Sequence, residues 1–114
     1  MFLKKLRKHL LPKNVADALE NFVKEVKGKY EDAEIYLFGS YAKGTWIEDS
    51  DIDVVVISKH FAKLSAEERV RILRKMASRK TPFQILAYTP EEFYKAKRKS
   101  VVLQDAEEYW VKLI

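Results

Sequence analysis

The chain has 114 residues, which suits one domain of ordinary size, and 47% of them are hydrophobic, enough for one core. It contains no cysteine, which excludes disulfides, thiolate zinc sites and a cysteine nucleophile. Two histidines, His9 and His60, cannot form a His-rich site, so a metal would be bound through oxygen, which points to magnesium, manganese or calcium. No stretch approaches the roughly 20 apolar residues of a membrane span, and the first residues mix charged and apolar side chains too finely for a secretory signal. We expect a cytoplasmic protein with no membrane partner.

The net charge is positive: 22 basic minus 17 acidic residues gives +5. Two interpretations of this charge remain open. It can belong to an ordinary solvated surface, or it can attract polyanions such as a nucleoside triphosphate or a nucleic acid.

The first half of the chain predicts a helix, a strand, a short helical turn and a second strand. Apolar residues at helical spacing, followed by a glycine, predict a helix over 14–28. The β-rich run 33–38 predicts a strand, and the small residues 40–45 predict one helical turn. The segment 52–58 contains four consecutive β-branched residues and predicts a strand buried on both faces.

The second half repeats the alternation of helix and strand. A capping-box pattern and helical apolar spacing predict a helix over 65–79 that Pro82 ends. The segment 83–88 predicts a third strand. A Thr-Pro-Glu-Glu helix start then predicts a helix over 90–98.

The tail, 100–114, predicts a short helix followed by a strand at 110–113. Together the elements predict one α/β (α+β) domain over 1–114, with a small mixed β-sheet and helices packed on it.

Four acidic residues lie within six positions of this basic chain: Glu48, Asp49, Asp51 and Asp53. Asp51 and Asp53 are two apart at the start of the second expected strand, so we expect their side chains on the same face. Two close carboxylates raise each other's pKa, and a divalent cation relieves their repulsion. Magnesium usually takes one or two carboxylates and completes its shell with water and phosphate oxygens. Taken alone, the pair can equally be an acidic turn that leads into a strand.

A Gly-Ser turn accompanies the acidic pair. Gly39 lets the backbone approach a ligand closely, and Ser40 adds a hydroxyl group to a turn whose free N–H groups attract anions. Gly44 permits a second tight turn, and Lys43 is placed to meet phosphate. The combination predicts an anion-binding loop that faces a cation-binding pair.

This stretch carries a family resemblance. The pattern G-S-x-A-x-G, five residues, and then S-D-x-D over 39–53 resembles the signature of the polymerase-β-like nucleotidyltransferases. It is most similar to the minimal nucleotidyltransferases (MNT), small prokaryotic proteins often paired with an all-helical HEPN partner. The segment YTPEEF at 88–93 is also similar to this family.

The resemblance implies a polymerase-β-like fold and a metal-dependent transferase. Asp51 and Asp53 would be the catalytic residues and would bind two Mg²⁺ or Mn²⁺ ions. ATP or another nucleoside triphosphate would be the substrate, from which a nucleoside monophosphate, typically AMP, passes to an acceptor hydroxyl while pyrophosphate leaves. The implied nucleotide-binding residues are Gly39, Ser40, Lys43, Gly44 and Ser50.

One position departs from the family pattern. The family normally places a third carboxylate on a neighbouring strand, and the matching position here is Gln84. Glutamine offers a carbonyl oxygen to a metal but carries no charge and cannot act as a base. Glu34 or Asp49 could compensate, of which Glu34 is the weaker candidate because it sits at the far end of its strand.

Three functions follow from these residues. The leading hypothesis is an enzyme that transfers AMP to a partner protein or RNA, as the antitoxin of a HEPN/MNT toxin–antitoxin pair. The alternative is a catalytically impaired module that binds nucleotide or partner, which Gln84 favours. A nucleic-acid-binding domain is a third and weaker possibility. Because the chain leaves little surface to enclose a base, we also expect a partner, either a HEPN-type protein or a second copy.

Overall fold

The structure, a computed structural model, describes residues 11–100 and 110–114. Its elements follow the predicted alternation of helices and strands, with one additional 3₁₀ turn. In chain order they are α2 (Lys13–Lys29), β1 (Glu34–Phe38), α3 (Ser40–Lys43), β2 (Ile52–Ile57), η1 (Lys59–Lys63), α4 (Ala66–Arg74), β3 (Phe83–Tyr88), α5 (Pro90–Lys99) and β4 (Val111–Lys112).

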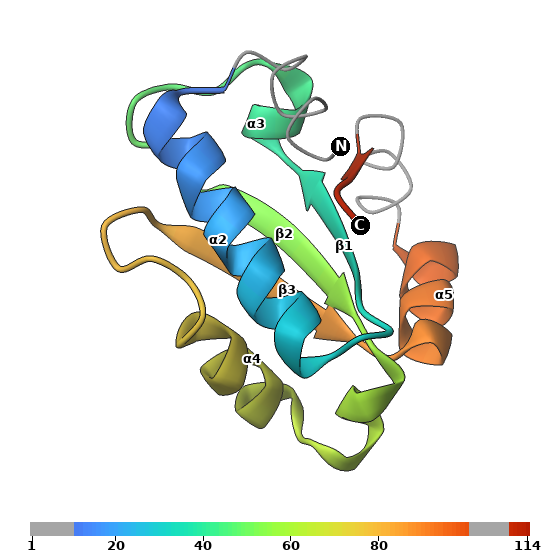
Figure 1. The fold of residues 1–114 in the computed structure, drawn as a ribbon. Helices are drawn as coiled ribbons and strands as arrows, with labels where there is room; N and C mark the ends of the chain where they lie inside the picture. The colour runs from blue at the N-terminus through green and yellow to red at the C-terminus, as the bar shows by residue number, and fades with distance from the viewer. Residues whose placement is uncertain (1–10, 101–109) are drawn as a thin grey trace.

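The strands form one mixed sheet in the order β3-β2-β1-β4 (Figure 1). Strand β1 pairs antiparallel with both β2 and β4, whereas β2 pairs parallel with β3. The parallel pair needs a crossover, which η1 and α4 supply. The predicted α/β class with a small mixed sheet is therefore confirmed.

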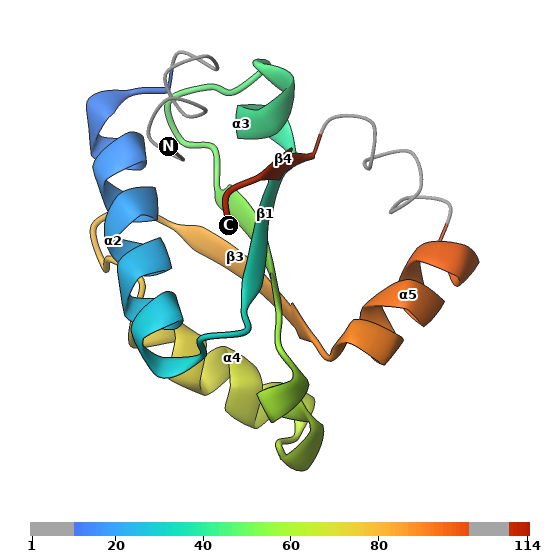
Figure 2. The same ribbon diagram turned by 45° about the vertical axis from the view of Figure 1, so that its right-hand side comes forward.

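Helices α2 and α4 cover one face of the sheet, and α5 lies on the other side (Figure 2). The apolar stripe of α2, which includes Leu19 and Phe22, packs on alternate residues of the strands because successive strand side chains point to opposite faces. The rings of Phe22 and Phe83 are 5.2 Å apart. The main core therefore lies between the sheet and its helical layer.

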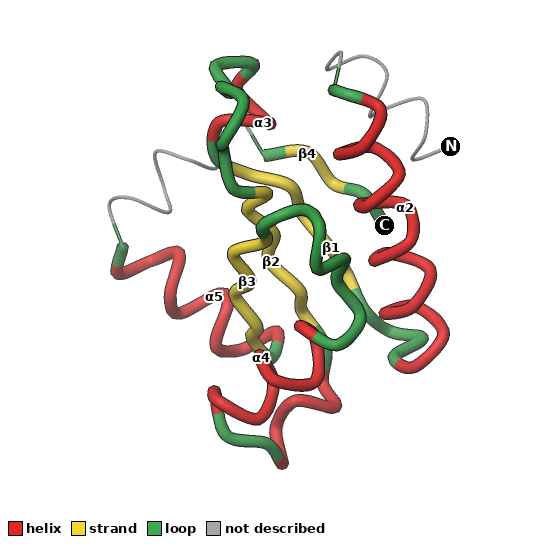
Figure 3. Tube along the Cα trace, turned by 90° about the vertical axis from the view of Figure 1, so that its left-hand side faces the viewer, coloured by secondary structure: helices red, strands yellow, loops and turns green. Residues whose placement is uncertain are grey.

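The second face of the sheet carries a cluster of aromatic side chains. Helix α5 contributes Phe93, whose ring stacks on Trp110 at 5.3 Å and lies 6.0 Å from Tyr36 of β1. Trp110 is also 6.0 Å from Phe38, the last residue of β1. Figure 3 shows the sheet between α2 on one side and α5 on the other. Strand β2, between the two layers, is almost entirely buried, as its composition predicted.

The helix predicted over 65–79 is too long. Helix α4 ends at Arg74, where the N–H groups of Met76 and Ala77 donate to carbonyl groups three residues earlier and tighten the chain into turns. Ser78 then accepts a hydrogen bond from the N–H of Lys80. Local turns therefore replace the last helical turn well before Pro82.

Two other segments compare differently with the predictions: the turn after β2 and the C-terminal tail. The 3₁₀ turn η1 was not predicted; Ser58 caps it by accepting from the N–H of His60. The predicted strand at 110–113 is confirmed as β4, while the predicted short helix before it lies outside the described residues. In the part of the chain that the structure describes, no helix has the length and apolar character to cross a membrane.

The Arg69 side chain joins three elements of the fold. Its guanidinium group is buried, donates to the carbonyl oxygen of Ala87 at 3.3 Å and forms a two-pronged ion pair with Glu92 of α5. Its Nε donates to the carbonyl of Leu64. This contact links the start of α4, the end of β3 and the start of α5.

Candidate active site at the ends of strands β1 and β2

The Gly39 turn and the Asp53 carboxylate lie directly against each other. Gly39 follows β1 and has a φ of 74°, a backbone conformation that residues with a Cβ rarely adopt. A Cβ atom on Gly39 would lie 2.0 Å from Oδ2 of Asp53. Only a glycine therefore lets the turn and the carboxylate approach this closely.

Asp53 is half-buried on β2, and Asp51 is exposed just before the strand. Burial, and to a lesser extent the nearby charge of Asp51, raise the pKa of Asp53 to about 6. Both causes disfavour a bare carboxylate, and a bound cation would offset both. The two aspartates are thus close enough to interact electrostatically, which fits a divalent-cation site.

The turn after Gly39 is shaped by its own backbone and by the loop that follows. Helix α3 begins at Ser40 with no side-chain cap at its N-terminus, and it ends at Gly44 in the left-handed conformation. Lys43 is exposed on this turn. Tyr41 is buried, and its hydroxyl group donates to the carbonyl of Ser50 at 3.3 Å.

Ser50 has a structural partner. Its hydroxyl oxygen accepts a hydrogen bond from the N–H of Ile47 at 2.8 Å, which closes the turn that leads to the aspartates. The backbone carbonyl oxygen of Ser50 also accepts a hydrogen bond from the Tyr41 hydroxyl group. The local hydrogen bonds of Ser50 therefore set the path of the loop between the glycine turn and β2.

Gln84 lies beside Asp53. In the parallel pairing of β2 and β3, Asp53 stands opposite Gln84, and in the antiparallel pairing of β1 and β2 it stands opposite Phe38. Residues paired in register project to the same face of a sheet. The position expected for a third carboxylate is therefore next to Asp53 and is held by an exposed amide.

The two acids considered as substitutes have different positions. Glu34 pairs with Ile57, at the opposite end of the β1–β2 ladder from Asp53, and its carboxylate faces Tyr36 and Lys112. Asp49 is exposed in the loop before Asp51 and, with Asp51, contributes to a raised pKa of Tyr41, whose first cause is burial. Geometry therefore excludes Glu34 and leaves Asp49 beside the site.

The described residues contain no group of three or more His, Cys, Asp or Glu side chains that could hold a metal ion. The cation-binding chemistry at this site thus rests on two carboxylates with an amide beside them.

The sequence did not indicate that Phe38 and Trp110 lie beside the site. Phe38 adjoins Asp53 through strand pairing, and Trp110 reaches Phe38 because β4 adds to β1. The β-rich composition near the C-terminus indicated a strand but carried no signal of its pairing partner.

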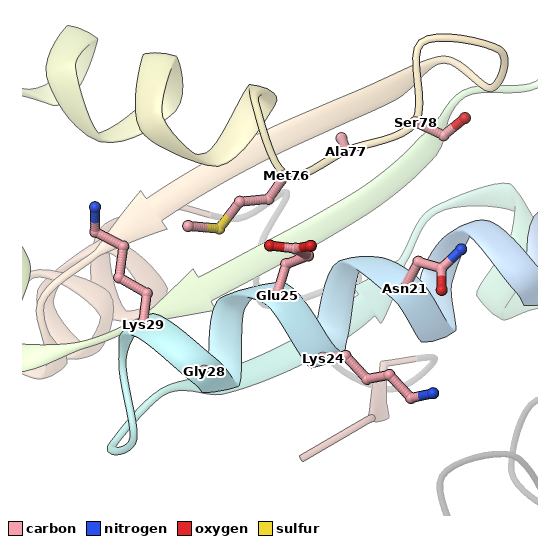
Figure 4. A pocket seen from close by; sticks show the side chains of 8 residues that line it. All are labelled: Asn21, Lys24, Glu25, Gly28, Lys29, Met76, Ala77 and Ser78. Atoms are coloured by element: carbon pink, nitrogen blue, oxygen red, sulfur yellow. The ribbon is translucent and has the colours of Figure 1, made fainter.

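A pocket of about 830 Å³ lies away from this motif, between α2 and the connection from α4 to β3. Figure 4 shows Glu25 pointing towards Met76 across it, with Lys29 at one end. Acidic and basic side chains share its lining, and none of the predicted site residues lines it.

Comparison with known proteins decides the family. The family model described as "Nucleotidyltransferase domain" matches residues 19–109, which include the Gly-Ser turn, the aspartate pair and Gln84. The chain belongs to the nucleotidyltransferase domain family. This places it in the polymerase-β-like superfamily that its motif resembles.

Curated relatives of this nucleotidyltransferase domain come from Methanocaldococcus jannaschii. One, named "Putative protein adenylyltransferase", is 28% identical over 101 residues, covering 87% of this chain and 98% of the relative. A second protein with the same descriptive name is 41% identical over 64 residues, but the match covers 54% of this chain and 43% of that relative. The match thus spans less than half of this second relative and nearly all of the first.

A solved structure supports the fold. The crystal structure titled as that of a "putative nucleotidyltransferase" from Sulfolobus solfataricus superposes with a TM-score of 0.59 at 21% identity. The superposition covers 69% of this chain and 70% of the other.

Proposed function

We propose that this nucleotidyltransferase domain transfers a nucleoside monophosphate, AMP in the first instance, from a nucleoside triphosphate to a hydroxyl group on a partner protein or RNA. The observation that carries the proposal is the contact between the Gly39 turn and the Asp53 carboxylate, with Asp51 beside it. A phosphate-binding turn and a cation-binding pair then meet at one point. The names of the curated relatives support AMP as the group transferred.

Asp51 and Asp53 are the residues that would hold Mg²⁺ or Mn²⁺. When bound, the metal supplies positive charge that neutralises the triphosphate and the departing pyrophosphate. The raised pKa of Asp53 supports this role because it marks a carboxylate whose charge lacks compensation within the chain.

The Gly39-Ser40 turn would bind the β and γ phosphates through backbone N–H groups and the Ser40 hydroxyl. The uncapped start of α3 supports this role. Lys43 adds positive charge on the same turn, while Gly44 and Ser50 hold the loop in shape. In this arrangement the chain contributes mainly positioning and charge neutralisation.

The test is transfer of label from α-labelled ATP, in the presence of magnesium, to a candidate helical partner protein or to total RNA. Asp53→Asn is expected to lower transfer by about a hundredfold or more, since it removes charge stabilisation at the reacting phosphate. Glu48→Gln is the matched control, because it removes an exposed carboxylate of the same loop. Equal loss in both variants, or none in Asp53→Asn, would refute the proposed site.

A second candidate function is favoured by Gln84. An amide beside Asp53 weakens the hold on a second cation and offers no base for the acceptor hydroxyl. The domain would then bind nucleotide and partner without efficient transfer. Nucleotide binding that persists alongside a transfer rate equal to that of Asp53→Asn would support this second function over the first.

We further propose that the domain is of the minimal nucleotidyltransferase type and acts in the cytoplasm as the antitoxin of a HEPN-type helical protein. The motif over 39–53 supports this assignment. Co-expression with a neighbouring HEPN-type reading frame tests it: relief of that protein's toxicity is expected.

A further inference from the structure

The connection between α4 and β3 carries a concentrated positive charge that the site described above does not use. Four cationic side chains line a hollow of about 550 Å³ there: Arg71, Arg74, Lys75 and Arg79. All four are exposed, and no carboxylate lines the hollow. Its volume lies within the roughly 300–1,000 Å³ typical of ligand sites.

None of these four cations forms a salt bridge in the described part of the chain. Arg71 does interact with one acid: after the hydrogen bonds to Ser65, its charge helps to lower the pKa of Glu68. Arg69 of α4, by contrast, is held in an ion pair with Glu92. Most of the positive charge of the hollow is therefore available to an external anion.

The hollow adjoins the aspartate pair through the backbone. Pro82 lines it, and the carbonyl of Pro82 accepts a hydrogen bond from the N–H of Ile52 at 2.8 Å. Ile52 stands between Asp51 and Asp53, and the next residues along β3 place Gln84 beside Asp53. Phe83 lines the hollow on the face that α2 and α4 cover, whereas Gln84 and Asp53 project from the opposite face of the sheet. A chain-like ligand that lies in the hollow would therefore pass around this end of the sheet to approach Asp53.

We propose that this basic hollow binds the phosphodiester backbone of a single-stranded RNA and directs a hydroxyl group of that strand towards Asp53. Three of the four cations are arginines, whose planar donors match phosphate oxygens. Successive phosphates can occupy a row of cations without a base-specific contact. The use of the strand as acceptor rests on the proposed function, whereas its binding does not.

Binding is measured by fluorescence anisotropy with a short, fluorescently labelled single-stranded RNA of mixed sequence, over a series of salt concentrations. The test variant combines Arg71→Gln, Lys75→Gln and Arg79→Gln. Arg74 is kept because its guanidinium group also donates to the carbonyl of Phe83.

The control variant combines Lys63→Gln, Lys95→Gln and Lys99→Gln, exposed cations on η1 and α5 outside the hollow. Each variant removes three positive charges, so the net charge falls from +5 to +2 in both. A difference in RNA affinity between the two variants therefore depends on where the charges lie and not on the total charge.

We expect the test variant to bind RNA at least about tenfold more weakly than the control, with its salt dependence reduced by about two counterions, since each phosphate contact contributes about 0.7 to the slope. Equal affinity of test and control variants would overturn the proposal. So would polyglutamate competing as well as RNA of equal charge at the same salt concentration, which would identify an acidic protein surface as the occupant.

A second measurement separates this inference from the proposed function. Labelled ATP and magnesium are added to the RNA complex, and a protein acceptor is assayed in parallel. If the wild-type chain and the control variant label the RNA and the test variant does not, the result supports the acceptor role. RNA binding with label transferred only to protein rejects that role, and label on neither substrate counts against the proposed function while the binding result stands.

Discussion

Gly39 does two things at once: with φ 74° and ψ −155° it adopts a backbone conformation that is essentially restricted to glycine, and it leaves room for Oδ2 of Asp53. Gly44 is in the left-handed α conformation, with φ 81° and ψ 16°, and a Cβ added there would meet nothing within 4 Å. Gly39 therefore combines greater backbone strain with a collision that Gly44 does not have.

We predict that Gly39→Ala destabilises the domain more than Gly44→Ala does. Gly44→Ala costs about 1–2 kcal/mol of backbone strain. Gly39→Ala costs up to about 3 kcal/mol of strain and also displaces Asp53. Chemical denaturation measures the two unfolding free energies. Gly28→Ala, in open space within α2, serves as the control for alanine itself and is expected to retain wild-type stability or gain up to about 1 kcal/mol. Equal losses of unfolding free energy in Gly39→Ala and Gly44→Ala would show that the Asp53 carboxylate moves away from the added Cβ at no cost.

At Gln84 the sequence departs from the family pattern. We predict that Gln84→Asp raises the rate of AMP transfer by about tenfold or more, because it restores a carboxylate next to Asp53 and strengthens the cation site. Single-turnover kinetics with manganese and magnesium measure the change. A rate no higher than that of the wild-type chain would show that the missing acid does not limit transfer.

At the level of secondary-structure elements, the Arg69–Glu92 ion pair fixes α5 to the rest of the domain. Arg69, by side-chain hydrogen bonding, and the backbone N–H of Thr89 lower the pKa of Glu92 to about 2. A depressed carboxyl pKa contributes stability that is complete above the unfolded value, near 4.5, and is lost as the pH falls towards 2.

We predict that Glu92→Gln is less stable than the wild-type chain at neutral pH and that the difference disappears as the pH falls from about 4.5 to about 2. The loss at neutral pH is expected to be about 1 kcal/mol, reduced by solvent screening because 45% of the Glu92 side chain is exposed. Thermal unfolding over this pH range is the measurement, and Glu91→Gln, one residue away on the exposed surface, is the control. A pH-independent difference would contradict the ion-pair interpretation.

Periodicity was sufficient to predict most elements, and tertiary contacts explain the exceptions. Helix α2 and strand β3 match their predicted ranges within one residue at each end because apolar spacing marks them. Gly28, which was expected to close the helix, lies inside α2, and the helix ends at Lys29. Helix α4 ends early because turns at 74–77 replace its predicted last segment. The buried position of Arg69 was available in the sequence, since Leu73, four residues on, lies on the same helical face.

The candidate site was predictable where its residues are close in sequence and not where strand pairing assembles it. The motif over 39–53 indicated the glycine turn and the aspartate pair, because one short connection joins them. The position of Gln84 beside Asp53 depends on the register of β2 and β3, which only the family resemblance anticipated. The basic hollow depends on the early end of α4, which no local pattern predicted.

For the whole molecule, the site is open to solvent. Asp51 and Gln84 are both exposed, so within the described residues no element covers the acidic end of β2. We predict that light scattering of the purified protein detects a mass above the 13.4 kDa of one chain, or that a helical protein co-purifies from the native host. A single-chain mass with no companion protein would contradict a required partner.

Both tryptophans of the chain contact residues next to the candidate site, so the protein has an intrinsic fluorescent probe there. Trp46 stacks on Tyr41 in the turn after Gly39, with ring centres 5.7 Å apart, and the ring of Trp110 lies 6.0 Å from that of Phe38, which pairs with Asp53. Nucleotide or metal binding should therefore change the intrinsic tryptophan emission without any added dye, and replacing each tryptophan by phenylalanine in turn would show which of the two contacts senses the ligand.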